Sequence, residues 1–452
     1  MGDYLSTNHG LKQEQHIQTP TTSINSQAKS LQEDIDSTIM ESHKKGRPRV
    51  LLAISVQPAD TMRADIAKDK QPRRDYLALQ EMLDADIIYL SDTQGTRLTR
   101  LIKRFFGPFT ALAWAAFCRR HQYDVIFTDT EIVSLPLALL LKLSRSRPGS
   151  PRHVALAHYL SPFKKRIFFR FGAGSHIDTV IVHSSAQREV ATDTLHLPDE
   201  RVMRLPYQVD VRFWHPLAPS EMDTNVISTA NDRPIICVPG LEQRDYPTLL
   251  SAVRDLNVSV YISTRSVTPQ QAALEKSPVW PKNTSFKMYN YGALRQLYAN
   301  ARLVIVPLLE VDFQAGITVI LEAMAMGKAV IVSGIRGQTD VVRDPRNDGR
   351  GPFGRTWWPG FLDNIDVAET LGRLPTGFYV TPGDPDELCS TIQYLLDHPE
   401  VADELGRNGR RVVEAYYSIE AFAQRFATAI IGNQNSEIQS GQETLCNNRN
   451  QI

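Results

Sequence analysis

Short apolar runs rich in β-branched residues alternate along this chain with longer segments of helical periodicity. In the first half the runs are Val50–Ile54, Ile87–Leu90, Val125–Thr128, Val154–Ala157 and Thr179–Val182. In the second half they are Ile235–Val238, Ser259–Ser263, Leu303–Val306, Ala329–Val332 and Gly377–Val380. Runs without polar alternation are typical of strands buried on both faces of a parallel sheet, with helices as crossovers. The sequence therefore predicts an α/β fold with two doubly wound, Rossmann-like sheets.

The segment 217–233, which reads LAPSEMDTNVISTANDR, has loop composition and separates the two sets of runs. We therefore expect a first domain at 47–216, a linker at 217–233 and a second domain at 234–431. The helical pattern at Ile419–Ile431 closes the second domain and can pack against either half. Residues 1–46 and 432–452 are rich in Ser, Thr, Gln and Asn, which predicts disordered tails.

Charge and cysteine usage narrow the class of protein. The 50 basic and 50 acidic residues give a formal net charge of zero, which argues against nucleic acid as the main partner. The four cysteines show no CxxC spacing and indicate neither a zinc site nor a disulfide framework. No apolar run reaches the ~20 residues of a membrane span, and the sequence shows no signal-peptide pattern. These features predict a soluble cytoplasmic protein.

One carboxylate lies in an apolar helix pattern. Glu322 belongs to QAGITVILEAMAMGKAVIV at 314–332, which is apolar on nearly every side and therefore predicts a buried helix. An unpaired buried carboxylate is unfavourable, so we expect Glu322 to be neutralised, paired, or hydrogen-bonded by a ligand such as a diol. The alternative is an ordinary Glu at the exposed mouth of a helix. The amino-terminal end of this helix follows a strand and lies on the ligand side, where free N–H groups attract phosphate.

Several segments of the second half, in this order, resemble the nucleotide-sugar glycosyltransferases of the GT-B fold, in particular the large retaining family with a Glu-x7-Glu motif (glycosyltransferase group 1, family 4-like). They are PGLEQRDYPTLLSAV at 239–253, LRQLYANARLVIVPL at 294–308, the 314–331 segment, TGFYVTPGDPDEL at 376–388 and LGRNGRRVVEAYYSIEAFAQRF at 405–426. In the first half, VALAHYLSP at 154–162 and residues 181–216 are also similar. The resemblance implies two domains that face each other across a cleft.

The resemblance also implies roles for residues of the donor side. Glu322 matches the second Glu of the motif, which accepts hydrogen bonds from the nucleotide ribose. Gln314 stands at the first Glu, whose role is to contact the donor sugar; a neutral amide can bond hydroxyls but cannot stabilise positive charge. Asp312 is a candidate substitute charge. The donor diphosphate would be bound by Arg244 and by the backbone N–H groups of a short segment that includes Gly316, Ile317 and Thr318. The alternative for Arg244 is a solvated surface cation.

On the acceptor side, His158 matches the family's cleft-facing histidine near the reacting sugar, and a structural histidine is the alternative. The family's glycine-rich loop is replaced by SVQPADTMRADIAKDKQPRRDY. Arg74 in this loop is a candidate contact for an anion or the acceptor, or simply begins a helix.

The resemblance thus implies a hexosyltransferase-like transferase in carbohydrate biosynthesis, which uses a UDP- or GDP-sugar and retains the anomeric configuration. No cofactor and no metal ion are indicated, and the acceptor is a small molecule or a lipid-linked molecule. Because of Gln314, a non-catalytic nucleotide-sugar-binding or scaffold subunit stays an alternative. A sugar-nucleotide epimerase is a third hypothesis.

Two basic and aromatic segments, Arg97–Arg120 and Ser161–Phe171, suggest peripheral contact with a membrane. A helix with Lys and Arg on one side and Phe, Leu or Trp on the other can rest on an anionic bilayer. The alternative is that both segments are crossover helices whose apolar sides pack on the first sheet.

Overall fold

The computed structural model describes residues 48–94, 97–144, 150–223, 233–240, 242–264, 280–347 and 371–432. The described residues from Arg49 onward belong to one compact unit. Except for Gly432, the tails predicted at 1–46 and 432–452 lie outside the described residues, as does 224–232 of the predicted linker.

The first half of the chain forms a six-stranded parallel sheet in the order β2-β1-β3-β4-β5-β6. Its strands are β1 (Val50–Ala53), β2 (Asp86–Ile88), β3 (Val125–Thr128), β4 (Arg152–Ala157), β5 (Thr179–Val182) and β6 (Val202–Arg204). The sequence did not predict β6. This strand has three residues and lies at the edge of the sheet, where Met203 is exposed, so it lacks a continuous apolar run.

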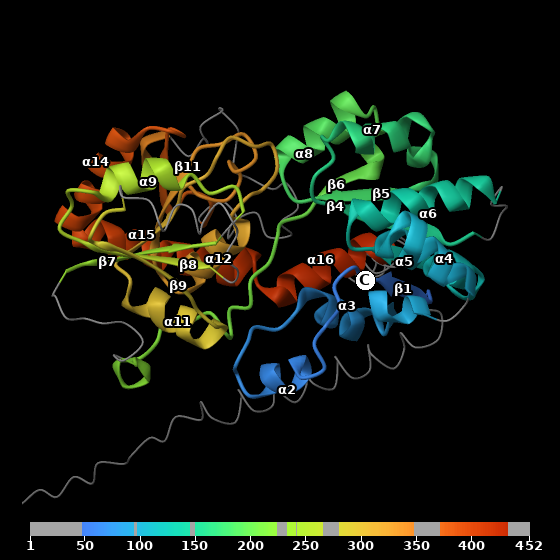
Figure 1. Cartoon of the computed structure of the whole chain (residues 1–452), viewed down its shortest axis with the longest axis horizontal. Helices are drawn as coiled ribbons and strands as arrows, with labels where there is room; N and C mark the ends of the chain where they lie inside the picture. Colours follow the sequence, from blue (N-terminus) through green and yellow to red (C-terminus); the bar gives the residue numbers. More distant parts are fainter. Residues whose placement is uncertain are drawn as a thin grey trace, which may run out of the picture. The chain divides into compact units, whose positions relative to one another are not determined.

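Helices cover both faces of this sheet (Figure 1). On one face, Val50 and Leu52 of β1 pack with α3 (Asp75–Leu83) and α16 (Ile419–Ile431). On the other, Leu51 and Ala53 pack with α5 (Pro108–Arg119) and α6 (Glu131–Leu143). This alternation follows from the two-residue period of a strand. The remaining helices of this half are α2 (Met62–Ala67), α4 (Arg97–Phe106), α7 (Phe163–Arg170) and α8 (Ser185–Glu189).

The second half forms another six-stranded parallel sheet in the order β12-β11-β10-β7-β8-β9. Its strands are β7 (Ile235–Pro239), β8 (Ser259–Thr264), β9 (Thr284–Met288), β10 (Leu303–Val306), β11 (Ala329–Ser333) and β12 (Gly377–Val380). The sequence did not predict β9, another edge strand, which is half exposed. One face is covered by α9 (Tyr246–Val253) and α14 (Pro385–Asp397), the other by α11 (Tyr291–Asn300), α12 (Ile317–Ala325) and α15 (Pro399–Tyr416).

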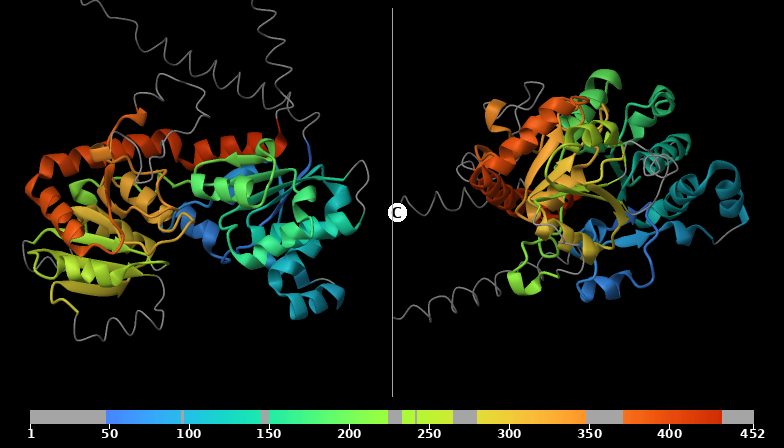
Figure 2. Two further views of the ribbon diagram at one scale, coloured as in Figure 1. Left: turned by 90° about the horizontal axis from the view of Figure 1, so that it is seen from above. Right: turned by 60° about the vertical axis from the view of Figure 1, so that its left-hand side comes forward.

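The last helix returns to the first sheet. α15 lies on the second sheet, and α16 continues from it across to the first (Figure 2). There Phe426 makes an edge contact with Phe127 of β3, with ring centroids 6.3 Å apart, and α16 packs on α3. The sequence left open which half this helix would join, and the structure places it on the first.

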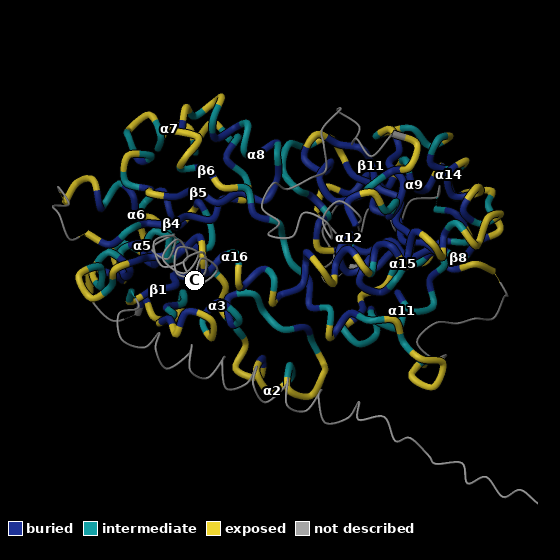
Figure 3. The backbone as a smooth tube through the Cα atoms, turned by 180° about the vertical axis from the view of Figure 1, so that it is seen from behind, coloured by how far each residue is buried: buried dark blue, intermediate teal, exposed yellow. Residues whose placement is uncertain are grey.

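Each sheet has one topological switch point, where consecutive crossovers run in opposite directions. In the first sheet it lies between β1 and β3, and in the second between β7 and β10. The strands around both points are buried (Figure 3). Ligands of open α/β sheets bind beyond the carboxyl ends of the strands at such points. Among the described residues, no helix has the length and apolar character needed to span a bilayer.

Candidate active site

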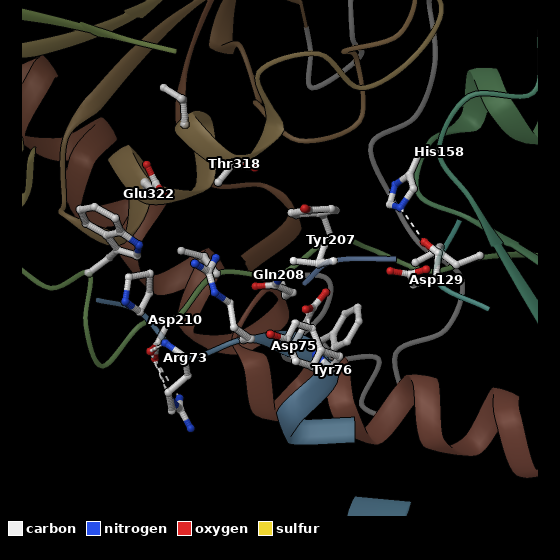
Figure 4. Close-up of a pocket in the computed structure, with 18 of the residues that line it drawn as sticks. Arg73, Asp75, Tyr76, Asp129, His158, Tyr207, Gln208, Asp210, Thr318 and Glu322 are labelled. Carbon is white, nitrogen blue, oxygen red and sulfur yellow. Dashed lines mark hydrogen bonds and ion pairs between the residues drawn. The ribbon is translucent and has the colours of Figure 1, made fainter. Parts of the chain in front are cut away.

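A cavity of about 710 Å³ lies at the carboxyl ends of strands from both sheets. Its lining includes Ser55, Asp129 and His158 from the first sheet, Tyr207 and Gln208 from the segment between the sheets, and Gly240, Thr318 and Glu322 from the second sheet. Figure 4 shows Glu322 and Thr318 at one end of this cavity and Asp129 and His158 at the other, with Tyr207 and Gln208 between them. The cavity therefore joins the two switch points.

Glu322 lies on α12, lines the cavity, and is 6% exposed, so the predicted buried carboxylate is present. One partner comes from the chain itself, because the Tyr298 hydroxyl donates a hydrogen bond of 2.9 Å to its Oε2. The sequence did not indicate Tyr298, which lies on α11, the helix before β10. The buried tyrosine thus fixes the position of the carboxylate.

Arg244 follows β7 and is 8% exposed, which excludes the solvated surface cation. Its Nε donates to the Pro239 carbonyl at 3.2 Å and its Nη1 to the Glu242 carbonyl at 2.6 Å. None of the ion pairs among the described residues includes it. Burial lowers the pKa of this guanidinium. A buried cation without a carboxylate is suited to an anionic ligand.

Two glycines lie next to this guanidinium, and Gly240 makes room for it. A Cβ atom on Gly240 would lie 2.1 Å from Nη2 of Arg244, and one on Gly316 would lie 2.7 Å from Cγ1 of Val306. Both glycines also have positive φ, +99° and +78°. The arginine thus lies between the loop after β7 and the amino-terminal end of α12, at the switch point of the second sheet.

The predicted donor-side residues take different positions at the start of α12. Gly316 is its N-cap and Ile317 its first residue, and Thr318 follows in the first turn. Thr318 lines the cavity; Gln314, Gly316, Ile317 and Arg244 are not among its lining residues. Oε1 of Gln314 is shielded from solvent and accepts no hydrogen bond from the described residues.

Asp312, the candidate substitute charge, is hydrogen-bonded to the first half of the chain. Its Oδ2 accepts a hydrogen bond from Ser161, and its carbonyl oxygen accepts one of 2.7 Å from Gln187. Asp312 therefore connects the two halves of the chain, and its role as a substitute charge stays a prediction.

His158 directly follows β4 and lines the cavity. Its Nε2 lies 3.1 Å from the carbonyl oxygen of Asp129, and its backbone N–H donates to Oε2 of Glu131 at 3.0 Å. A carbonyl oxygen only accepts, so Nε2 carries the proton and the neutral ring has its lone pair on Nδ1. The ring is exposed, and its centroid lies 5.3 Å from that of His183.

Arg74 lines the cavity and is the N-cap of α3, so it also begins a helix. Its Nη2 donates to the Tyr291 hydroxyl at 3.1 Å. The neighbouring Arg73 is paired with Asp210 at 2.9 Å and with Glu420 at 2.9 Å. Arg74 therefore remains the candidate anion contact in this loop.

Sequence analysis also missed Asp129, which directly follows β3. A polar residue at the end of a buried strand is the signal that could have identified it. Among the described residues, no group of three or more His, Cys, Asp or Glu side chains is arranged to hold a metal ion.

Comparisons with known proteins agree with this geometry. Residues 241–352 match the family model described as Glycosyl transferases group 1. No curated protein matches the chain.

Solved structures share the fold at low sequence identity. HepE from Anabaena in complex with UDP-glucose is 16% identical, with a TM-score of 0.58 over 85% of this chain and 99% of that chain. Sucrose-phosphate synthase from Thermosynechococcus elongatus is 18% identical, with a TM-score of 0.58 over 85% of this chain and 98% of that chain. A glycosyltransferase from Rickettsia africae is 15% identical, with a TM-score of 0.58 over 86% and 100% of the two chains.

Proposed function

We propose that this chain, a glycosyltransferase with a group 1 domain, transfers a sugar from a UDP- or GDP-sugar to an acceptor hydroxyl with retention at the anomeric carbon. The observation that carries the proposal is the switch point of the second sheet. There the carboxylate of Glu322 lines the cavity, and the guanidinium of Arg244, which has no ion pair among the described residues, lies beside the start of α12.

The donor would occupy the Glu322 end of the cavity. A carboxylate suits the two hydroxyls of a ribose, because each can donate a hydrogen bond to it. The diphosphate would form an ion pair with the guanidinium of Arg244. It would also accept hydrogen bonds from the N–H groups of Gly316, Ile317 and Thr318, where the α12 dipole adds positive potential. HepE, which has the same fold, was solved with UDP-glucose and with UDP.

The reaction would proceed by stabilisation of the leaving diphosphate. Preorganised positive potential from Arg244 and α12 stabilises the charge that develops as the sugar–phosphate bond breaks. Oε1 of Gln314, which has no partner among the described residues, would accept a hydrogen bond from a hydroxyl of the donor sugar. Nδ1 of His158 would accept one from a hydroxyl near the reacting carbon. The leaving phosphate would take the acceptor proton. We propose that no metal ion and no further cofactor are needed.

A donor panel tests the proposal. Purified protein is incubated with UDP- and GDP-sugars, nucleotide release and product formation are measured, and binding is followed by thermal shift, since a bound ligand raises the stability of the folded state. We expect one nucleotide series to bind and to be turned over. Binding without turnover of any donor would favour the non-catalytic alternative, and isomerised donor without an acceptor would favour the epimerase.

We also propose peripheral contact with an anionic membrane, for which α4 is the main support. Leu98, Leu101 and Phe105 lie on one side of this helix, and Arg97, Arg100 and Arg104 on the other. The apolar residues are not packed on the first sheet: Leu101 is 52% and Phe105 69% exposed, whereas α5 provides the buried crossover face. A short helix of this pattern is typical of the membrane interface.

The second basic helix, α7, has the same character. Phe163 and Phe171 at its two ends are 75% and 68% exposed, and Lys164 and Arg166 are exposed between them. Lys165 differs, because it is paired with Glu131 at 2.6 Å. A lipid-linked acceptor would suit such an attachment to the membrane; a small-molecule acceptor would not need it.

The location that we propose is the cytoplasm. Cys118, Cys237 and Cys389 are free thiols, which supports it.

A further inference from the structure

We infer that Asp129 binds the acceptor, and that this acceptor is an uncharged polyhydroxylated molecule, a sugar or a glycoside, rather than a phosphorylated one. This inference rests on the proposed glycosyl transfer and assigns the first sheet its substrate.

The position of Asp129 is the first support. It directly follows β3, and Ser55 lies just beyond β1, so the two residues occupy the switch point of the first sheet. Both line the cavity that Glu322 lines from the second sheet. If the donor fills the second switch point, the first is the place where a co-substrate meets it.

The hydrogen bonding of Asp129 is the second support. The backbone N–H and the hydroxyl of Ser55 each donate a 2.8 Å hydrogen bond to Oδ2. Oδ1 is shielded from solvent and accepts no hydrogen bond from the described residues. An unpartnered buried oxygen is unfavourable unless a ligand supplies the donor. Burial raises the pKa of Asp129 to about 6, against the two bonds from Ser55, which lower it.

The neighbouring histidine indicates what kind of group binds. Nε2 of His158 bonds the carbonyl oxygen of Asp129, so in the neutral ring Nδ1 presents a lone pair, which has no partner among the described residues. Asp129 and His158 thus offer two hydrogen-bond acceptors at the same end of the cavity (Figure 4). Such a pair recognises hydroxyl donors, which a sugar carries on adjacent carbons.

The charges beside Asp129 disfavour an anion there. Asp75 also lines the cavity and interacts electrostatically with Asp129. Of the two lining arginines, Arg73 is neutralised by Asp210, and Arg74 donates to Tyr291. The buried Arg244, which has no ion pair among the described residues, lies at the other switch point, where its guanidinium would pair with the donor diphosphate. A phosphate on the acceptor would therefore face the carboxylates of Asp129 and Asp75.

Matched acceptor pairs test the inference. Glucose, fructose and glycerol are each compared with their phosphate esters, with the nucleotide sugar that binds best as donor. We expect transfer to a neutral member of the panel and at least tenfold lower kcat/KM for its ester. We expect Asp129→Asn to lower kcat/KM for that acceptor by about tenfold to a hundredfold, mainly through a higher KM. This is the loss expected when a hydrogen bond to a charged group is removed. Donor affinity should not change.

Controls separate binding from folding. Retained donor binding shows that the Asp129→Asn protein is folded, and Asp86→Asn, an exposed carboxylate on β2 of the same sheet, should keep the acceptor KM. Preference for the phosphate esters, an unchanged acceptor KM in Asp129→Asn, or no transfer to any neutral member by a protein that binds and cleaves the donor would overturn the inference. A protein that binds no nucleotide sugar would instead overturn the proposed function.

Discussion

The hydroxyl of Tyr298 lies 2.9 Å from Oε2 of Glu322 and donates a hydrogen bond to it. The tyrosine is fully buried on α11, and the carboxylate lines the cavity from α12. One oxygen of Glu322 is thus held by the protein. This arrangement orients the carboxylate before any ligand arrives, which lowers the entropic cost of binding.

Replacement of Glu322 by Ala should weaken nucleotide binding. Loss of a hydrogen bond to a charged group costs about 1.5–3 kcal/mol, so we expect the Kd for UDP or GDP to rise by about tenfold to a hundredfold. Calorimetric titration measures it. Tyr298→Phe, which removes the support but keeps the carboxylate, should give a smaller loss; an unchanged Kd in Glu322→Ala would remove the assignment of this residue to the ribose.

The side chain of Gln314 should matter more for turnover than for nucleotide affinity. Its Oε1 has no partner among the described residues, and in the proposed complex it contacts the sugar rather than the nucleotide. Gln314→Ala should therefore lower kcat or change sugar preference while the Kd for the free nucleotide stays within about twofold, well below the loss of one charged hydrogen bond. Steady-state kinetics with several sugars and titration with UDP distinguish the two effects. An equal loss of turnover and of nucleotide affinity would contradict the assignment of Gln314 to the sugar.

Arg244 should discriminate the diphosphate from the nucleoside. Arg244→Gln removes the buried charge, and we expect binding of UDP to weaken by about 1.5–3 kcal/mol whereas binding of uridine changes little. Parallel titrations with both ligands measure the difference. Lys at this position should restore only part of the affinity, because it lacks the bidentate geometry of a guanidinium. Similar losses for uridine and UDP would point to a structural role.

Contact of α4 with lipid should be measurable by flotation with vesicles that contain anionic lipid. The double variant Leu101→Ser, Phe105→Ser should bind less, because both side chains are exposed in the free protein and their loss should not affect folding. Leu143→Ser is a matched control, since Leu143 on α6 is 79% exposed but lies outside α4 and α7. Equal flotation of all three proteins, or none, would refute the membrane proposal.

Two buried histidines should make the fold sensitive to acid. Burial lowers the pKa of His153 to about 4 and that of His183 to about 3, below the ordinary value of 6.5. The unfolded chain therefore binds protons first as pH falls below 6.5, and stability decreases down to the folded pKa values. At pH 5 the loss from His153 should be about 2 kcal/mol.

Urea unfolding at pH 7 and pH 5 measures this loss. His153→Gln should show a smaller decrease between the two pH values than the wild type, whereas His121→Gln, at an exposed position, should behave as the wild type. The titration of Asp129 has the opposite effect on stability between pH 6 and pH 4. Burial raises its pKa to about 6, so the folded state binds this proton first as pH falls. This contribution is common to all three proteins. If the unfolding free energy of His153→Gln had the same pH dependence as that of the wild type, the acid sensitivity would not come from His153.

The sequence predicted the interior strands and the edge strands β2 and β12, but not the edge strands β6 and β9. Runs such as Val125–Thr128 and Leu303–Val306 appear as β3 and β10 because both of their faces are buried, which selects continuous apolar residues. The edge strands β6 and β9 have partly exposed residues, such as Met203 and Met288, and so carry no such signal. Arg97–Arg120, read as one segment, is two helices separated at Gly107, whose φ is +88°.

By itself the sequence determined the two parallel sheets, the buried helix that carries Glu322, and the resemblance to group 1 transferases, because these depend on local periodicity and on motifs along the chain. Only the tertiary structure decided which residues of the site contact one another. Tyr298 beneath Glu322, Arg244 between Gly240 and Gly316, and Ser55 on Asp129 come from segments tens of residues apart or from opposite sides of a turn. Hydrogen bonds and burial are properties of proximity in space, and the order of strands in each sheet brings these residues together.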